Sequence, residues 1–176
     1  MKKFVLLLAA LLVVGCGEKT SSGDTESASE KATTPSEAPK SLSDADVERL
    51  VKEAVDSDSL EERDGLFYQN NEPFSGWVKS RYDSGQVQGL GHLIDGKPDG
   101  LQTGWYENGQ KMREGTFKRG NPDGLGAMWH ENGQKLAEGT YKDGEEVSAK
   151  YWNRKGEEVK TWEEATEVEA REEAEE

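Results

Sequence analysis

The side chains that could do chemistry in this chain are few, and several of them return at a fixed interval. Two carboxylates, Glu114 and Glu138, stand 24 residues apart, and the two histidines are His92 and His130. Paired carboxylates can act as general acid and base or cleave a glycosidic bond. However, residues that return with a repeat hold equivalent places in a fold. We therefore expect Glu114 and Glu138 to be structural, and we predict no catalytic residue.

Three aspartates raise the same question for a metal ion. Asp95, Asp99 and Asp123 lie beside glycine or proline, where a short carboxylate side chain hydrogen-bonds the backbone of a turn. Their spacing does not match an EF-hand loop. The sequence also shows no phosphate-binding loop, no metal-binding cluster and no nucleophile triad. It thus predicts a non-enzymatic protein with no metal ion and no cofactor.

A repeat of 24 residues sets the elements that carry these side chains. Residues 105–111, Trp-Tyr-Glu-Asn-Gly-Gln-Lys, return as 129–135, Trp-His-Glu-Asn-Gly-Gln-Lys. The pairs Asn108-Gly109 and Asn132-Gly133 separate strand-like runs, and Asn-Gly favours a two-residue type I′ hairpin turn. Segments 95–100 and 120–124 bring proline and glycine for a second reversal. The pattern predicts an all-β, single-layer meander of antiparallel hairpins with a period of 23–24 residues.

A two-residue turn would also assign every side chain to one face of the sheet. With Asn108 and Gly109 at the tip, Trp105 shares a face with Met112 and Glu114. The opposite face then takes Tyr106, Lys111 and Arg113. Gly91, Gly115 and Gly139 each stand two residues before a large apolar residue on that face, and we expect such glycines to lie beneath rings.

Aromatic residues form rows along the predicted sheet, and two interpretations of them are open. The rows are either packing within the sheet, or an exposed platform that binds a protein or a sugar. His130 stands where the preceding repeat has Tyr106, so we interpret it as an aromatic substitute on a packed face. The candidate binding surface consists of Trp77, Tyr82, Trp105, Tyr106, Trp129, His130 and Trp152.

Residues 64–156 resemble the MORN repeat, in the bacterial variant form often grouped with YwqK-family antitoxins. Three segments carry the resemblance: 105–111, Glu-Gly-Thr-Phe-Lys at 114–118, and Asn-Pro-Asp-Gly-Leu at 121–125. Two copies are good, the first is diverged, and the last, at 150–156, has lost one residue and the Asn-Gly pair. The resemblance implies a β-repeat scaffold, and the antitoxin name implies binding to a partner toxin.

The start of the chain has the features of an export signal. Lys2 and Lys3 precede an apolar run over 4–14, which is too short to span a bilayer as a mature helix. Residues 13–16, Val-Val-Gly-Cys, resemble the lipobox of bacterial lipoproteins. The resemblance implies a signal peptide over 1–15 and acyl chains on Cys16, with Gly17 favouring the outer membrane, on its periplasmic or surface side, in a Gram-negative cell. An uncleaved signal anchor is the alternative.

Composition separates the remaining segments. Residues 16–42 carry the anchor and a polar tether with too few large apolar side chains to fold. Residues 43–57 show the i, i+3, i+4 spacing of an amphipathic helix, which either caps the first edge of the sheet or binds a partner. Residues 157–176 form an acidic tail that can become helical and that we expect to be exposed and frayed.

The formal charge of −14 belongs mostly to the flanks, because residues 61–156 carry only −2. The repeats therefore lack the basic stripe of a nucleic-acid-binding protein. Taken together, the sequence predicts a lipid-anchored envelope protein whose repeats contact an unknown protein partner. A glycan or cell-wall ligand is one alternative, and neutralisation of a toxin is another.

Overall fold

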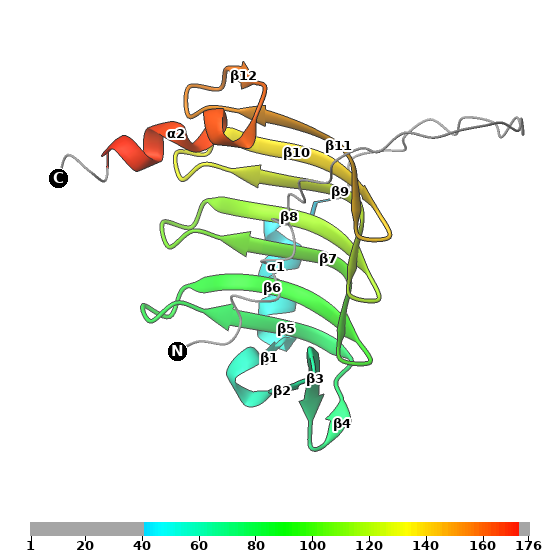
Figure 1. Cartoon of the computed structure of the whole chain (residues 1–176). Helices are drawn as coiled ribbons and strands as arrows, with labels where there is room; N and C mark the ends of the chain where they lie inside the picture. Colours follow the sequence, from blue (N-terminus) through cyan, green and yellow to red (C-terminus); the bar gives the residue numbers. More distant parts are fainter. Residues whose placement is uncertain (1–40, 173–176) are drawn as a thin grey trace, which may run out of the picture.

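One sheet of nine strands carries the repeats (Figure 1), in a computed structural model that describes residues 41–172. The predicted signal peptide, Cys16 and the tether up to residue 40 lie outside the described residues. Strands β5 to β11 are consecutive antiparallel neighbours, as the repeat predicts. Their bounds are Gly76–Arg81, Val87–Ile94, Lys97–Trp105, Lys111–Lys118, Asn121–Trp129, Lys135–Lys142 and Glu145–Trp152.

The loops at the Asn-Gly pairs are one residue longer than the sequence predicts. Tyr106 N–H donates to Gln110 O at 2.8 Å, and Gly109 N–H donates to Tyr106 O at 2.9 Å. The loop therefore has three residues, Glu107 to Gly109, of which only Gly109 has a positive φ, +85°. This is a type I turn closed by a left-handed glycine, so the prediction of a two-residue type I′ turn was wrong. The hairpin itself was predicted correctly.

The extra loop residue shifts two side chains to the other face. Trp105 pairs with Lys111 and Gly104 with Arg113, so Met112 is a bulge residue without a partner of its own. Lys111 consequently lies on the face of Trp105 and Glu114, and Met112 lies beside Gly104 and Arg113 on the other face. The predicted places of Lys111 and Met112 were exchanged, because a bulge reverses the alternation of side chains.

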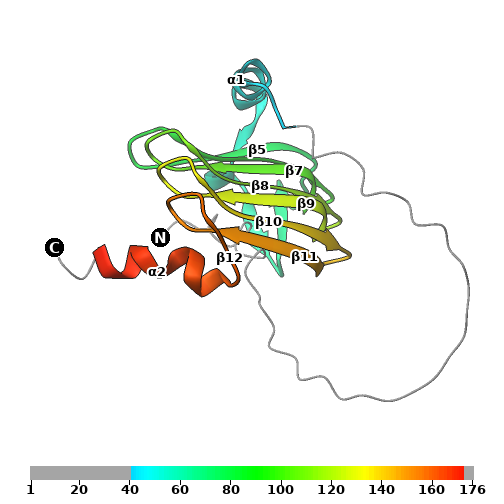
Figure 2. The same ribbon diagram turned by 90° about the horizontal axis from the view of Figure 1, so that it is seen from above.

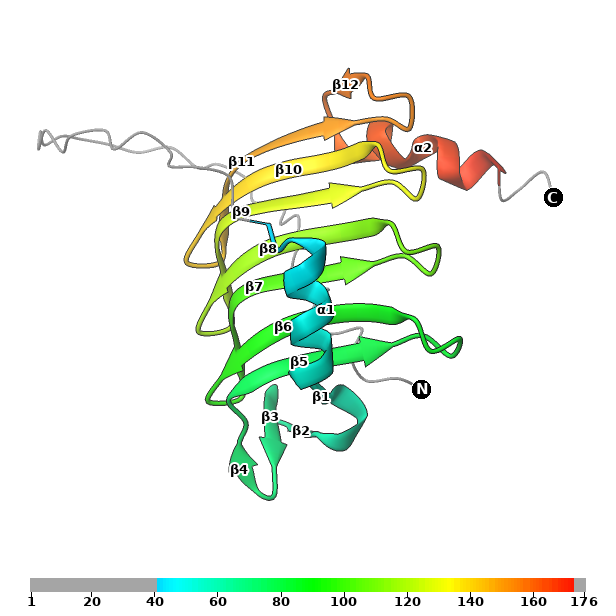
Figure 3. The same ribbon diagram turned by 180° about the vertical axis from the view of Figure 1, so that it is seen from behind.

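Helix α1, Asp44–Glu53, covers part of one face, which we call the helix face. Ser43 caps it by accepting from Asp46 N–H. Its apolar residues pack with Leu90 on β6 and with Trp77 and Trp105; the helix crosses the sheet from β8 to β5 (Figure 3). The two-residue strand β1, Val55–Asp56, then pairs in parallel with β5. The sheet edge is thus paired by β1, whereas the predicted helix lies on a face.

A second, three-stranded sheet lies against the opposite face. It consists of β2, Glu61–Arg63, β3, Leu66–Gln69, and β4, Glu72–Pro73, and follows the 3₁₀ turn Ser57–Ser59. Leu60 and Phe67 pack on Val78 and Leu93, which are 0% and 1% exposed. Residues 64–73, predicted to open the repeat region, therefore belong to this small sheet.

The far end of the repeat sheet is covered on the opposite face by helix α2, Trp162–Glu172. Strand β12, Glu158–Val159, pairs with the end of β11. The Trp162 ring meets Tyr151 edge to face at 6.2 Å, and Ala165 is fully buried. The tail therefore begins as a docked turn, which corrects the expectation of an exposed helix. The two helices lie on opposite sides of the sheet (Figure 2).

Strand glycines accept neighbouring side chains, although not always rings. A Cβ on Gly139 would lie 3.3 Å from the Tyr141 ring, as predicted. At Gly91 the neighbour is the amide of Gln102, which donates to His92 O at 2.8 Å. A side chain at Gly91 would displace that buried amide. The ring prediction thus fits Gly139 and is wrong at Gly91.

Candidate functional site

One aromatic row of the candidate surface holds successive repeats together. Tyr82 donates to the carbonyl of Trp105 at 2.8 Å, and Tyr106 donates to the carbonyl of Trp129 at 2.7 Å. His130 places its Nε2 3.0 Å from the carbonyl of Trp152 and is fully buried. Each ring therefore bridges its own turn to the next hairpin, and His130 acts as the expected substitute for tyrosine.

The turn residues make a second bond of the same kind. Asn108 Nδ2 donates to Glu131 O at 3.1 Å, and Asn132 Nδ2 donates to Arg154 O at 3.0 Å. Their Oδ1 atoms accept from the backbone of Gln110 and Gln134, which closes each turn. The side chains of Asn108 and Asn132 thus fix both the turn and its distance from the next repeat. Gly109 and Gly133 supply the positive φ angles, +85° and +84°.

Replacing Tyr106 by phenylalanine should weaken the junction between two repeats. The change removes one hydrogen bond to a carbonyl and keeps the ring, so we expect the free energy of unfolding to fall by about 1 kcal/mol. Urea denaturation of the full chain measures it. Tyr68→Phe on the small sheet is the control, and we expect less than about 0.5 kcal/mol there. Equal losses in both variants would contradict the bridging role.

Arg113 packs beside Gly104 on the opposite face. A Cβ on Gly104 would lie 3.3 Å from its Cγ, so the glycine provides the room for the arginine stem. Burial lowers the pKa of Arg113 to about 10, against the opposing effect of Tyr82 and Tyr106. The guanidinium remains charged at neutral pH. Tyr82, Tyr106 and His130 therefore serve packing within the sheet, which is the first of the two interpretations.

The tryptophans divide into a covered and an uncovered group. Trp77 and Trp105 are half-buried beneath α1. Trp129 and Trp152 lie on the same face beyond the helix, and each has a lysine ammonium above its ring. Lys111 Nζ is 5.4 Å from the Trp129 centroid, and Lys135 Nζ is 5.4 Å from the Trp152 centroid. Cation–π contacts of this length are attractive, and they occupy one face of each ring.

The same lysines bind the repeating glutamates. Lys111 Nζ lies 2.8 Å from Glu114 Oε2, and Lys135 pairs with Glu138 in the next repeat. Glu114 is buried and also accepts from Ser41 Oγ at 3.0 Å and from Thr103 Oγ1 at 3.4 Å. Ser41 in turn accepts from Lys111 Nζ at 2.6 Å. A hydroxyl group from the segment before α1 therefore bridges the lysine and the glutamate.

Sequence reasoning missed this arrangement because it placed Lys111 on the wrong face. The available signal was the recurrence of lysine and glutamate three residues apart, at 111 and 114 and again at 135 and 138. The first repeat has Val87 and Leu90 at the same places, and there α1 lies on the sheet. The change from apolar to charged residues marks the edge of the area that α1 covers.

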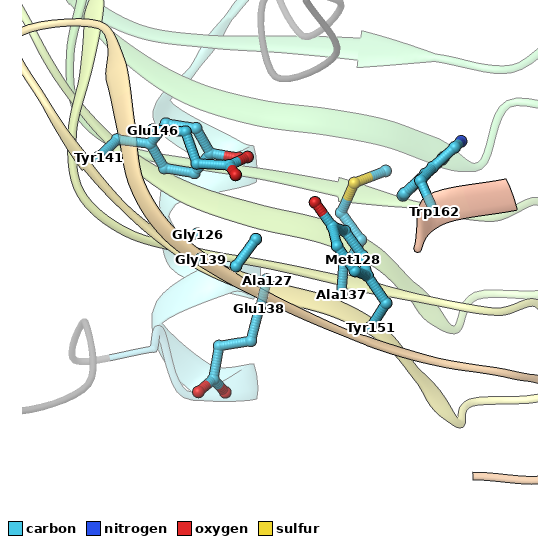
Figure 4. A pocket seen from close by; sticks show the side chains of 11 residues that line it. Gly126, Ala127, Met128, Ala137, Glu138, Gly139, Tyr141, Glu146, Tyr151 and Trp162 are labelled. Atoms are coloured by element: carbon cyan, nitrogen blue, oxygen red, sulfur yellow. The ribbon is translucent and has the colours of Figure 1, made fainter. Parts of the chain in front are cut away.

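A small hollow lies between α2 and the opposite face (Figure 4). Tyr141, Tyr151 and Trp162 form its walls, and Gly126 and Gly139 lie at its floor. Its volume is about 30 Å³, enough for a water molecule and far below the ordinary size of a small-molecule pocket. The hollow is therefore a packing feature.

Burial and the carboxylate of Glu146 raise the pKa of Tyr141 to about 12. A raised phenol pKa means that the folded state resists ionisation. The stabilising contribution is complete below the unfolded pKa of about 10 and is lost as the pH rises towards 12. We expect Tyr141→Phe to flatten the fall in stability between pH 10 and 12. Urea midpoints across this range, compared with Tyr68→Phe, measure the effect; parallel curves for wild type and Tyr141→Phe would contradict it.

Within residues 41–172, no three His, Cys, Asp or Glu side chains gather as a metal ion would require. Asp99 and Asp123 instead accept backbone N–H groups 20 residues ahead, at Arg119 and Asp143. Neither helix of this region is long and apolar enough to cross a bilayer.

Three periodic contacts now define the unit: the ring that reaches the next hairpin, the asparagine of the turn, and the aspartate at the third residue of β7 or β9. Asp99 and Asp123 were predicted to lie in turns, but the structure places both in strands, because the second reversal is complete at residues 95–96 and 119–120. Residues 98–119 and 122–143 match the MORN repeat variant. Each matched segment begins at the second residue of β7 or β9 and continues through β8 or β10. MORN repeats are non-catalytic scaffolds that generally contact proteins or membranes. The comparison with curated proteins finds no match.

Proposed function

We propose that this protein is a lipid-anchored, non-enzymatic scaffold of a bacterial envelope that holds a protein partner on its MORN repeats. The observation that carries the proposal is the division of the helix face. Its first half is covered by α1, and its second half, over β9 to β11, presents Trp129 and Trp152 beyond the helix. Half-buried tryptophans framed by charged side chains are typical of protein contact surfaces.

The state of these rings favours a protein over a glycan. A sugar stacks on the open face of an aromatic ring, whereas Lys111 and Lys135 lie over Trp129 and Trp152. Trp77 and Trp105 are packed against α1. Stacking would first have to displace a lysine that is also paired with a glutamate. A sugar ligand is therefore the weaker alternative on this surface.

The anchor is proposed from the lipobox resemblance at 13–16, and it has its own test. Cys16→Ala should move the protein from the membrane fraction to the soluble fraction after cell breakage. Mass spectrometry of the wild-type chain should show a mature protein that begins at an acylated Cys16. An unprocessed chain that still carries residues 1–15, or an alanine variant that stays with the membrane, would contradict the lipid anchor.

The partner is tested by photo-crosslinking in cells. A photoreactive amino acid at Ser148, which is exposed on the helix face of β11, should capture one specific protein. The same group at Arg119, exposed on the turn between β8 and β9, is the matched control and should capture none. Capture of no specific protein at Ser148, or of the same proteins at both positions, would contradict the proposal. A captured toxin would identify the antitoxin form of the same function.

A further inference from the structure

We propose that Lys135, Glu138, Lys150 and Trp152 form a binding site for an extended protein segment that carries a serine or threonine hydroxyl next to acidic residues. We call these four residues the open site. The inference rests on the proposed function and names the place and the chemistry of the protein contact. It starts from the equivalent residues one repeat earlier, where the chain itself supplies such a hydroxyl.

The occupied site is built from Lys111, Glu114 and Trp129. Ser41 Oγ donates to Glu114 Oε2 at 3.0 Å and accepts from Lys111 Nζ at 2.6 Å. Ser41 is in extended backbone, and the residues that follow it begin α1 with Asp44 and Asp46. The repeat thus shows which ligand fits it: a hydroxyl group on an extended chain.

The open site has the same geometry without the hydroxyls. Lys135 pairs with Glu138 and lies 5.4 Å from the Trp152 centroid, as Lys111 does with Glu114 and Trp129. The position of Thr103 is taken by Ala127, so Glu138 lacks that donor too. Within residues 41–172 the only recorded donor to the Glu138 carboxylate is Lys135. Two of the three bonds that Glu114 Oε2 accepts therefore have no counterpart at Glu138.

Exposure and charge also distinguish the open site. The side chain of Glu138 is 46% exposed, against 6% for Glu114. In the strand register, Lys150 on β11 lies opposite Glu138 on β10. The residue opposite Glu114 on the following strand is Ala127, so Glu114 has no lysine there. The open site carries two lysines and one glutamate, so it favours a ligand with negative charge near the hydroxyl.

The two sites lie on one line across the strands. Glu114, Ala127 and Glu138 are partners in consecutive strands, which places the two glutamates two strand spacings apart, about 9.6 Å. An extended segment covers this distance in about three residues. A partner chain on the open site would therefore lie beyond Ser41, in line with the segment that leads into α1, without displacing it.

The test uses the full chain and a synthetic peptide with the sequence of residues 41–48, Ser-Leu-Ser-Asp-Ala-Asp-Val-Glu. Titration followed by NMR should shift the Trp152 indole and the amide signals of Lys135 and Glu138. Replacing both serines of the peptide by alanine should weaken binding about 10-fold, the effect of losing one hydrogen bond to charged groups. Binding should also weaken as the salt concentration rises.

Variants of the protein make the test specific. Lys135→Ala and Glu138→Gln should each weaken peptide binding about 10-fold. Lys142→Ala is the matched control, because Lys142 forms an exposed pair with Asp123 at a distant turn; we expect unchanged binding. No peptide-induced shifts up to millimolar concentration, or equal binding by the serine and alanine peptides, would overturn the proposal. So would the same shifts with diacetylchitobiose in place of the peptide, because the site would then be a sugar site.

The outcome separates this inference from the proposed function. If Ser148 still captures its protein partner equally well in Lys135→Ala and Glu138→Gln, the open site is refuted and the scaffold function stands. If no specific partner is captured by the wild-type chain, the scaffold function fails whatever the peptide does.

Discussion

Replacing Leu90 by glutamate should detach α1 from the sheet. Leu90 is 2% exposed and packs against Leu50 and Ala54 of the helix segment. Deleting a buried leucine costs about 2–5 kcal/mol, and a buried carboxylate adds a desolvation cost. The new carboxylate would also stand beside Lys79, whose Nζ donates to the carbonyls of Val51 and Ala54 at the end of α1. We expect the helix to lose both its apolar contact and its terminal cation.

Amide hydrogen exchange of residues 47–53 measures this detachment. We expect it to rise about 100-fold, which corresponds to about 2.7 kcal/mol, while exchange in β8 to β10 changes little. Leu90→Met is the control, because a volume-conserving change costs less than about 1.5 kcal/mol. Unchanged exchange in α1 of the glutamate variant would show that the helix is held by contacts other than Leu90. The variant also copies the later repeats, since Glu114 and Glu138 hold the same place.

Replacing Gly96 by alanine should destabilise the joint between the two sheets. Gly96 has φ +77°, and a Cβ there would lie 2.7 Å from Phe67 O and 3.0 Å from Phe67 N. Both atoms belong to the backbone of β3, so the turn between β6 and β7 and strand β3 would have to move apart. Gly96 also donates to Phe74 O at 2.8 Å and accepts from Phe67 N at 3.0 Å. We expect a loss of about 2–4 kcal/mol, from left-handed strain and from the clash.

Gly85 provides a matched control for the strain alone. Its φ is +88°, and a Cβ there would meet nothing within 4 Å. Gly85→Ala should therefore cost only about 1–2 kcal/mol. Urea denaturation of both variants measures the difference, which is the cost of the backbone contact. Equal losses of unfolding free energy in the two variants would mean that the small sheet moves away from the methyl group at no cost.

The hairpins were predictable because their signals are local. An Asn-Gly pair between strand-like runs sets a reversal whatever surrounds it, and repetition shows that each reversal occurs again. Ser43 and Asp46 likewise located the start of α1 within one residue. The last repeat still turns at Asn153 to Gly156 without an Asn-Gly pair, because Gly156 supplies the positive φ of +81°.

The face of each charged side chain was not predictable to the same degree. One additional loop residue exchanges Lys111 and Met112 between faces, and the sequence Glu-Asn-Gly-Gln is compatible with loops of two or three residues. Because the lysine then meets Glu114 and Trp129, the error hid the arrangement on which the binding proposal depends. The choice between the loops is made by the twist and pairing of the neighbouring hairpins.

The sequence by itself determined a repeating antiparallel sheet, its turns, the helix before it and the structural role of His130, since each depends on residues close together in the chain. Only the tertiary structure decided where α1 lies, which tryptophans it covers and which hydroxyl group reaches Glu114. Such contacts join residues far apart in the chain, as Ser41 and Glu114 are, at 73 positions. Such contacts depend on how the hairpins stack, and a local sequence pattern does not show which distant residue will lie beside it.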